Sequence, residues 1–339
     1  MTVFEQLSYD QQVQWWTGIA EDALEAYALH DARLELLTYS NNAVFTVRRG
    51  DGRFVLRLHR PELARERWIR SELLWLRAIC DNSDLVVPYP VETRAGDLVA
   101  SVRVERLSAP VHAVLFRHIE GESRQPADIS ADEVGQVGVF LAKLHSIPYT
   151  PPDDFQRPRL DWEGLFGEES LYDPGEGARL FSAEQREVFA AVAKRVREVM
   201  AALGQDADHF GLIHADLLCK NVLFHQGAAR ALDFEYCGRG YYLYDLTPIL
   251  WQLRDNGRYP ELLQAMWQGY TSIRPLSENQ RELLEVFIAG RHLASCRWIA
   301  GNLGNASIRE KAPQILAERT GEMRRFLETG RLERRSEIL

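Results

Sequence analysis

Most of the strand-like sequence lies in the first third of the chain, and helical sequence fills most of the rest. Gly50-Asp51-Gly52 separates two runs in which apolar and β-branched residues are frequent, a pattern typical of a hairpin. A helical segment over about residues 62–79 follows the hairpin. The strand-like runs of this part are 43–49, 53–59, 98–104 and 111–119. Their order predicts a small, mostly antiparallel sheet with one helix laid across it.

The remaining sequence is dominated by apolar residues at helical spacing. A short hairpin within 222–232 interrupts it, and residues 150–178, which are rich in Pro, Gly and acidic side chains, have the composition of an irregular segment. The expected helices are 9–29, 133–144, 182–203 and further helices from Tyr244 onward. At 339 residues the chain is too long for a typical single core. We therefore expect an α+β protein with two lobes, residues 1–119 including the N-terminal helical extension, and residues 120–339.

Composition excludes several functional classes. Hydrophobic residues make up 46% and charged residues 26%, as in soluble globular proteins. The net charge of -9 and the lack of a dense basic run before the C-terminal tail argue against nucleic-acid binding. No uninterrupted apolar run approaches the roughly 18 residues of a membrane helix, and no secretory signal is expected. The four scattered cysteines form no C-x-x-C pair, so a cytoplasmic protein without disulfides or zinc is expected.

Polar side chains gather in one segment of the helical part. His214, Asp216 and Asn221 fall in a loop before a hydrophobic strand, and Asp233 follows the next strand. A capping Asp, a turn Asn and a solvated Asp would be a plain structural explanation for each residue alone. Their joint spacing is instead the catalytic-loop pattern of kinases, in which the first Asp accepts the proton of the attacking hydroxyl.

The hairpin after this loop suggests a metal site. If its turn centres on Gly227, antiparallel pairing sets Val222 opposite Leu232 and Asn221 opposite Asp233, with Cβ atoms about 4.5–5.5 Å apart. An amide oxygen and a carboxylate side by side suit Mg²⁺, which takes oxygen ligands and keeps waters and substrate phosphates in its shell.

The whole arrangement resembles the aminoglycoside phosphotransferase and choline kinase superfamily. The resemblance rests on His214-Ala-Asp-Leu-Leu-Cys-Lys-Asn-Val-Leu-Phe224, on Leu232-Asp-Phe-Glu235, on Leu141-Ala-Lys-Leu-His-Ser146 and on Tyr244-Asp-Leu246. It extends in order over roughly residues 35 to 300. It implies a bilobal protein-kinase-like fold with ATP and Mg²⁺ in the cleft, Asp216 as catalytic base, and Asn221 and Asp233 as metal ligands, with His214 and Asp245 in support.

The resemblance also implies a phosphate-binding cation in the first lobe. The matching strand presents Arg57 where most kinases have Lys. Val55, Arg57 and His59 share the less apolar face of this strand, so a solvent-facing Arg is the weaker interpretation. Glu72 sits on an apolar helical stripe and needs a compensating cation. We therefore expect an Arg57–Glu72 ion pair, with a Glu that reaches solvent as the alternative.

Two further segments are assigned to the nucleotide by their order in the family. The loop 38–43 should cover the phosphates, and the connector 116–121 should lie against the adenine. The residues that these assignments name are Ser40, Asn41, Asn42, Phe116, His118 and Ile119. His145 is expected to be structural, and Cys219 is given no chemistry. The acidic segment 161–176 could hold an amine, although a solvated loop is the commoner explanation.

Together these features predict an ATP-dependent phosphotransferase that acts on a hydroxyl of a small molecule, such as an aminoglycoside-, homoserine- or choline-like acceptor that could carry an amine. Two alternatives stay open at this point. One is a Ser/Thr protein kinase of the bacterial stress-response type, which would share every residue above. The other is a nucleotide-binding regulatory module with degraded catalysis.

Overall fold

The computed structural model describes residues 8–39, 42–61, 65–105, 107, 109–168 and 170–332. The chain divides into two compact units. Unit 1 comprises Met1–Glu120 and Pro148–Gln156, and unit 2 comprises Gly121–Ile147 and Arg157–Leu339. Among the described residues, no helix is both long and apolar enough to cross a membrane.

Unit 1 is built on an antiparallel sheet of six strands in the order β1-β2-β3-β6-β4, with β5 also paired to β6. The strands are β1 (Arg33–Tyr39), β2 (Asn42–Arg49), β3 (Gly52–His59), β4 (Pro90–Val91), β5 (Ala100–Val102) and β6 (Val111–Arg117). β2 and β3 form the expected hairpin, because Gly50 adopts a positive φ of 55° at the turn. β1 and β4 complete the sheet at its two edges.

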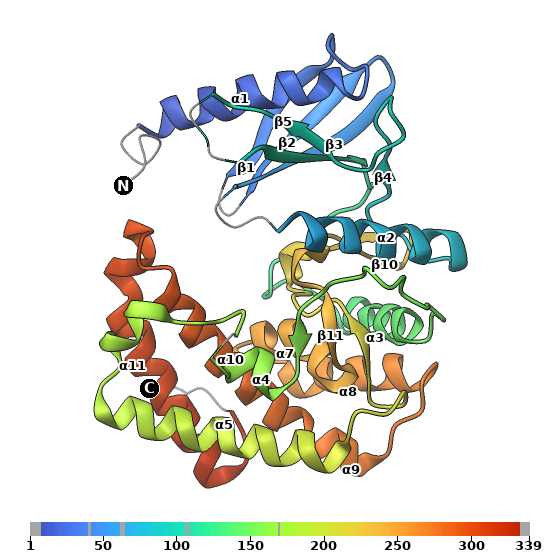
Figure 1. Cartoon of the computed structure of the whole chain (residues 1–339). Helices are drawn as coiled ribbons and strands as arrows, with labels where there is room; N and C mark the ends of the chain where they lie inside the picture. The colour runs from blue at the N-terminus through green and yellow to red at the C-terminus, as the bar shows by residue number, and fades with distance from the viewer. Residues whose placement is uncertain are drawn as a thin grey trace. The chain divides into compact units, whose positions relative to one another are not determined.

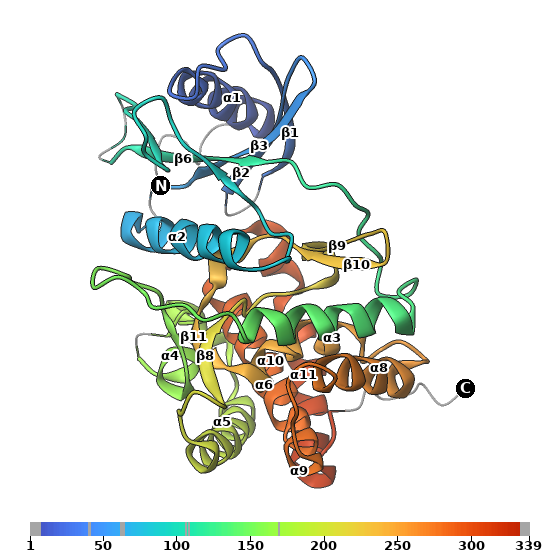
Figure 2. The ribbon, with the colours of Figure 1, turned by 90° about the vertical axis from the view of Figure 1, so that its right-hand side faces the viewer.

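Two helices cover opposite faces of this sheet (Figures 1 and 2). α1 (Tyr9–Glu25) packs its buried stripe, including Trp16, on the apolar sheet side chains Phe45 and Leu56. α2 (Glu66–Asn82) lies on the other face, toward which Arg57 points. The period of two along β3 therefore separates an apolar core from a charged pair.

The first helix ends earlier than the expected residue 29. Ala28 adopts a positive φ of 56°, the Leu29 amide donates to the Leu24 carbonyl, and the Ala28 amide donates to the Glu25 carbonyl. These two bonds form a Schellman motif, which ends a helix and satisfies its last carbonyl groups. Apolar periodicity continues past this point, so the pattern alone could not locate the end.

Unit 2 is mainly helical. Its helices are α3 (Ala131–His145), α4 (Trp162–Phe166), α5 (Ala183–Leu203), α6 (Tyr242–Asp245), α7 (Thr247–Leu253), α8 (Tyr259–Thr271), α9 (Glu278–Glu282), α10 (Leu284–Gly301) and α11 (Ala306–Thr329). α10 is buried on nearly all sides and contacts α5, α7 and α11, which makes it the central helix of the unit. The α+β class, with an antiparallel sheet in unit 1 and helices in unit 2, is confirmed.

Two small sheets accompany the helices of unit 2. β9 (Val222–His225) and β10 (Ala228–Ala231) form the expected hairpin, while β7 (Arg159–Leu160), β11 (Gly238–Tyr241) and β8 (Phe210–Ile213) form a sheet that the sequence did not predict. Strands of two to four residues are too short to show a period of two. β7, α4 and the 3₁₀ turn Gly175–Leu180 also give order to much of the segment 150–178.

Candidate active site

The candidate catalytic loop follows β8, which ends at Ile213, and the carboxylate of Asp245 fixes its backbone. The two oxygens of Asp245 accept hydrogen bonds from the backbone amides of His214, at 2.8 Å, and Ala215, at 2.6 Å. Ala215 has a positive φ of 70°, which is unfavourable for a residue with a Cβ. The bonds to Asp245 offset this strain, so the predicted supporting contact of Asp245 with the loop backbone is confirmed.

Asp245 is itself fixed by a buried histidine. His145 Nε2 donates to Asp245 at 2.9 Å, and the hydroxyl of Tyr270 lies 3.0 Å from His145 Nδ1. Burial lowers the pKa of His145, so the ring is neutral near pH 7 and its Nδ1 accepts the Tyr270 proton. Burial opposes ionisation of Asp245, but the bonds from His145 and the His214 amide hold its pKa below the ordinary value. His145 is therefore structural, as expected.

His214 ties the loop to the far strand of the hairpin. Its Nδ1 accepts from the Asp216 amide at 3.2 Å, and its Nε2 donates to the carbonyl of Leu232 at 2.9 Å. The ring also contacts Phe234, with the ring centroids 4.4 Å apart. His214 thus positions the backbone on either side of the site and is too buried to reach a ligand.

The predicted hairpin register was wrong by one residue. Val222 pairs with Ala231, not with Leu232, and the Leu232 amide donates to the Asn221 carbonyl at 2.8 Å. The turn consists of Gln226 and Gly227, which both have positive φ values, 51° and 76°. Such a two-residue turn matches strand twist better than a turn centred on Gly227 alone. Asn221 therefore lies opposite Leu232, and Phe224 lies opposite Ala229.

Asp233 lies one residue beyond the hairpin, in a left-handed conformation with φ 61° and ψ 71°. Asn221 is buried, and its Nδ2 donates to the Asp216 carbonyl at 2.8 Å, which leaves its amide oxygen as the potential cation ligand. Within the described ranges, no three His, Cys, Asp or Glu side chains group as a metal site. One amide and one carboxylate fit a cation such as Mg²⁺ that completes its shell with phosphates and water.

Asp216 pairs with a residue that sequence reasoning missed. Arg291 Nη2, on α10, donates to Asp216 Oδ1, and the two side chains are only 8% and 13% exposed. Burial raises the pKa of the Asp216 carboxyl above its usual value, against the lowering effect of the Arg291 charge. The available signal was an arginine inside the apolar run 286–294, where a cation requires a partner. Cys219 lies nearby, but burial raises the pKa of its thiol to about 11, which agrees with the absence of an assigned role.

In unit 1 the predicted Arg57–Glu72 ion pair is present. Arg57 Nη2 lies 2.8 Å from both carboxylate oxygens of Glu72, and both side chains are buried. The guanidinium also lies over the ring of Phe116, 5.2 Å from its centroid. The alternative, a Glu72 that reaches solvent, is excluded. That this arginine binds nucleotide phosphates stays a prediction.

The other segments assigned to the nucleotide are placed only in part. Ser40 and Asn41 lie outside the described residues. Asn42 is the first residue of β2, where it is buried and pairs with His59, so the loop is shorter than the expected 38–43. β1 reaches Tyr39 because a register shift between Leu36 and Thr38 extends its pairing with β2.

The connector continues β6 out of the sheet. Phe116 is buried within β6, and the His118 amide donates to the Arg53 carbonyl at 3.1 Å. Burial and the nearby charge of Arg53 lower the pKa of His118. The backbone leaves β6 at Arg117, before Ile119. The role of this connector in adenine binding stays a prediction.

The acidic segment 161–176 is engaged in local structure. Asp161 caps α4 by accepting from the Gly164 amide, and it also pairs with Arg159 at 2.7 Å. Glu176 pairs with Arg179 on the surface. These contacts match the solvated-loop interpretation more closely than an amine cradle.

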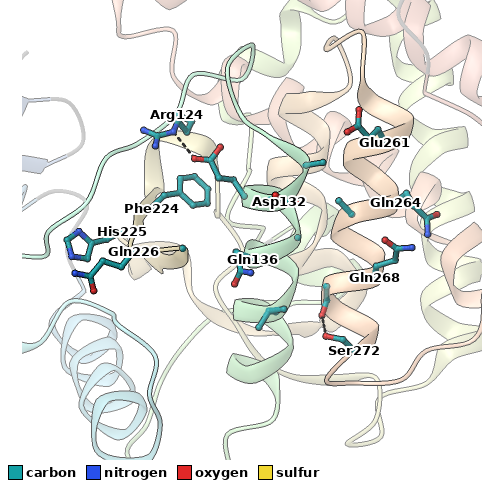
Figure 3. Close-up of a pocket in the computed structure, with 17 residues that line it drawn as sticks. Arg124, Asp132, Gln136, Phe224, His225, Gln226, Glu261, Gln264, Gln268 and Ser272 are labelled. Atoms are coloured by element: carbon teal, nitrogen blue, oxygen red, sulfur yellow. Dashed lines mark hydrogen bonds and ion pairs between the residues drawn. The ribbon is translucent and has the colours of Figure 1, made fainter.

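A separate hollow of about 870 Å³ opens between α3, α8 and the tip of the β9-β10 hairpin. Gln136 projects from α3, while Gln264 and Gln268 lie along α8 (Figure 3). His225 and Gln226 border it from the hairpin turn. None of the predicted site residues lines this hollow, so we do not assign it to the reaction.

Comparisons with known proteins show to which family the chain is similar. A model of the "Phosphotransferase enzyme family" matches residues 36–283. The homoserine kinase of Gluconobacter oxydans (strain 621H) is 30% identical over 266 residues, which cover 74% of this chain and 75% of that protein. The homoserine kinase of Chelativorans sp. (strain BNC1) is 28% identical and covers 82% and 84%.

Solved structures show the same fold. A microcompartment-associated aminopropanol kinase matches with a TM-score of 0.82 and 28% identity, covering 94% of this chain and 99% of that one. An amicoumacin kinase solved with AMP-PNP and Ca²⁺ matches with a TM-score of 0.73 and 18% identity, covering 90% and 93%. The resemblance and the kinase-like fold are confirmed, and a small-molecule kinase is favoured over a protein kinase or a regulatory module.

Proposed function

The chain belongs to this phosphotransferase enzyme family and is a kinase that phosphorylates a hydroxyl of a small molecule, and we propose that the acceptor is a small amino alcohol or a hydroxyl-bearing amino acid. ATP is the phosphate donor in this proposal. The single observation that supports phosphate transfer at this site is the buried loop around Asp216. Asp245 fixes the backbone before Asp216, and the Asn221 side chain donates to the Asp216 carbonyl.

Asp216 is the catalytic base in this proposal. Its carboxylate accepts the proton of the acceptor hydroxyl as the hydroxyl oxygen attacks the γ-phosphorus of ATP and the bond from that phosphorus to the β–γ bridging oxygen breaks. ADP and the phosphorylated acceptor result. The loop is rigid before substrate arrives, because its amides and the His214 ring are already bonded. Such preorganisation places the base without further ordering at the moment of reaction.

Asn221 and Asp233 would hold a divalent cation, Mg²⁺ in this proposal, which would neutralise charge on the phosphates when bound. Arg57, oriented by Glu72, is the phosphate-binding cation of unit 1, and residues 116–119 with Ser40, Asn41 and Asn42 contact the nucleotide. We assign residues 1–119 to covering the nucleotide and residues 120–339 to catalysis and acceptor binding. The described free cysteines, three of them buried, suit the reducing cytoplasm in which we place the protein.

The choice of acceptor class rests on two kinds of relative. Homoserine and aminopropanol, named for relatives 30% and 28% identical to this chain, both carry an amine close to a hydroxyl. The net charge of -9 is compatible with a cationic acceptor.

The test is a transfer assay with the purified full chain. ADP release would be followed with Mg²⁺ and ATP against homoserine, aminopropanol, ethanolamine, choline, an aminoglycoside and casein, with Asp216→Asn as the matched control. We expect acceptor-dependent ADP release with at least one of the small amino alcohols or homoserine. Release with casein alone would indicate a protein kinase, and ATP binding without release in any reaction would indicate a regulatory module.

A further inference from the structure

Arg291 is a cation in a place that water does not reach. It lies near the middle of α10, between the buried residues Gly290 and His292, and only 7% of it is exposed. A buried guanidinium costs free energy unless a partner and hydrogen bonds compensate for its lost hydration. The described partners are few and specific, so they indicate what the side chain does.

Each terminal nitrogen of Arg291 is bonded to one group. Nη2 donates to Asp216 Oδ1, and Nη1 donates to the hydroxyl of Tyr172 at 3.1 Å. Nε is buried, and the hydroxyl of Tyr244 also lies beside the guanidinium. The guanidinium is buried, and both of its terminal nitrogens are bonded to protein groups. Its contact with the reaction runs through Asp216.

Tyr172 is in turn held in place, so the arginine has a fixed support. The side chain is 3% exposed, and Arg297, one and a half turns further along α10, donates from Nε to the Tyr172 carbonyl at 3.1 Å. The Tyr172 ring stacks parallel to Tyr236, with 4° between the ring planes. α10 therefore clamps both the backbone and the hydroxyl of Tyr172.

We propose that Arg291 is a positioning residue of the phosphotransfer reaction, which fixes Oδ1 of Asp216 so that Oδ2 faces the acceptor hydroxyl. The inference rests on the proposed function, in which Asp216 is the base. Within the described part of the chain, no side chain donates to Oδ2 of Asp216. One oxygen is thus held by a charge-assisted bond, and the other accepts the proton that the acceptor hydroxyl loses as it attacks the γ-phosphorus.

A purely structural ion pair would have the same geometry, so the test must separate the two roles. Arg291→Met would be measured in the wild-type chain and in the Asp216→Asn chain. A residue that acts only through Asp216 has no further effect once the carboxylate is gone, since groups that act as a unit are not additive. A residue that only stabilises the fold lowers the rate by the same factor in both chains.

We expect Arg291→Met to lower kcat by about 10- to 1,000-fold, part of the roughly 10²–10⁴-fold contribution of a positioned acid–base group. KM for ATP should change little. Arg291→Lys, which keeps the charge, should recover part of the rate, and Tyr172→Phe, which removes one support, should show a smaller kcat loss. In the Asp216→Asn chain, Arg291→Met should change the residual rate by less than about twofold, within the error of additivity for independent sites.

Arg254→Met is the matched control. Arg254 is a partly buried arginine of unit 2, with an ion pair to Glu322 at 3.4 Å, but it does not contact Asp216. It should lower the melting temperature and leave kcat near the wild-type value. Should Arg291→Met fail to fold, Arg291→Lys and Tyr172→Phe carry the comparison in both chains. Retained stabilisation by an ATP analogue identifies the variants that are folded.

Two outcomes overturn the inference and differ from each other. If Asp216→Asn transfers phosphate at the wild-type rate, the proposed base is wrong and the role of Arg291 falls with it. If Asp216→Asn is impaired, but Arg291→Met lowers the rate equally in both chains or raises only KM, Asp216 keeps its role and Arg291 is merely structural.

Discussion

The carboxylate of Asp245 and the imidazole of His145 meet in the fully buried interior of unit 2, 2.9 Å apart and 100 residues apart in sequence. Asp245 ends the short helix α6 and His145 ends α3. Because Asp245 also accepts the His214 and Ala215 amides, a bond between two helix ends determines the backbone path of the catalytic loop.

Asp245→Ala should therefore impair both stability and transfer. It removes the acceptor for two backbone amides and a histidine, and each buried donor left unsatisfied costs about 1–3 kcal/mol. Ala215 would also lose the bond that offsets its positive φ. Chemical denaturation and the transfer assay measure the two effects. Asp206→Ala, which breaks the exposed pair with His209, is the control and should change neither noticeably. If Asp245→Ala and Asp206→Ala have the same stability and the same transfer rate, this role for Asp245 is contradicted.

Asp216→Asn should abolish most of the transfer without weakening nucleotide binding. The substitution keeps the shape of the side chain and removes the carboxylate that accepts the proton. A loss of about 10²–10⁴-fold in kcat is expected. ATP binding, followed by the thermal shift with a nonhydrolysable analogue, should be retained. An undiminished rate with the true acceptor would remove Asp216 from the mechanism.

Substitutions of Arg57 and Glu72 should reduce the rate of phosphate transfer to different degrees. Arg57→Lys keeps the charge but loses the planar group that can engage a carboxylate and a phosphate together, so we expect a partial loss of transfer. Arg57→Ala should be much worse, chiefly in kcat. Glu72→Ala misaims the cation without deleting it and should resemble Arg57→Lys. Transfer rates of the three variants decide the matter. Wild-type activity in Arg57→Ala would show that the phosphate-binding cation comes from elsewhere.

These same residues show which features of the site could be predicted from the sequence and which could not. Arg57 and Glu72 could be paired because alternation along a strand and spacing along a helix place each on a known face. The hairpin register could not be derived, because the same sequence can form a turn centred one residue away. That shift changes the residue opposite Asn221 from Asp233 to Leu232. Arg291 was missed because its partner is 75 residues away, and tertiary packing alone brings α10 to the catalytic loop.

The chain should lose stability on mild acidification because of His292. Trp251 Nε1 donates to its Nδ1 at 2.7 Å, and Glu322 and Arg319 of α11 and Arg254 surround it. Burial lowers its pKa from 6.5 to about 4 despite the Glu322 bond. Between these values the unfolded chain binds the proton and the folded chain does not. Stability conferred by the neutral ring is therefore present above pH 6.5 and is lost as the pH falls toward 4, by about 1.4 kcal/mol per pH unit.

Glu322 also makes the folded chain less stable as the pH falls, because its pKa in the folded chain is below the ordinary value. Burial alone would raise this pKa, but the His292 bond and the nearby charges outweigh the effect of burial. The measurement is the free energy of unfolding in urea from pH 7.5 to 4.5, for the wild type and for His292→Gln. The variant should show a shallower decline over this range by about one proton. Identical slopes for the two chains would mean that His292 does not contribute.

The last prediction concerns the crossing of α3 and α8, whose backbones approach closely through glycines. A Cβ added at Gly138 would lie 2.4 Å from the carbonyl oxygen of Met266 and 2.8 Å from the backbone nitrogen of Tyr270. Both are backbone atoms of a helix, so they cannot rotate away as a side chain could. Gly138→Ala gains about 1 kcal/mol of helix propensity, but separating the helices costs typically 1–3 kcal/mol or more. Tyr270 moves with α8 and bonds His145, so this separation also disturbs the support of Asp245. We expect a net loss of stability with a lower kcat.

Gly321→Ala in α11 is the control, since its Cβ would meet only the flexible end of Arg325 at 3.8 Å, and it should be neutral or stabilising. Chemical denaturation and transfer rates of both variants make the comparison. A Gly138→Ala chain as stable as Gly321→Ala would show that α3 and α8 do not need this close approach.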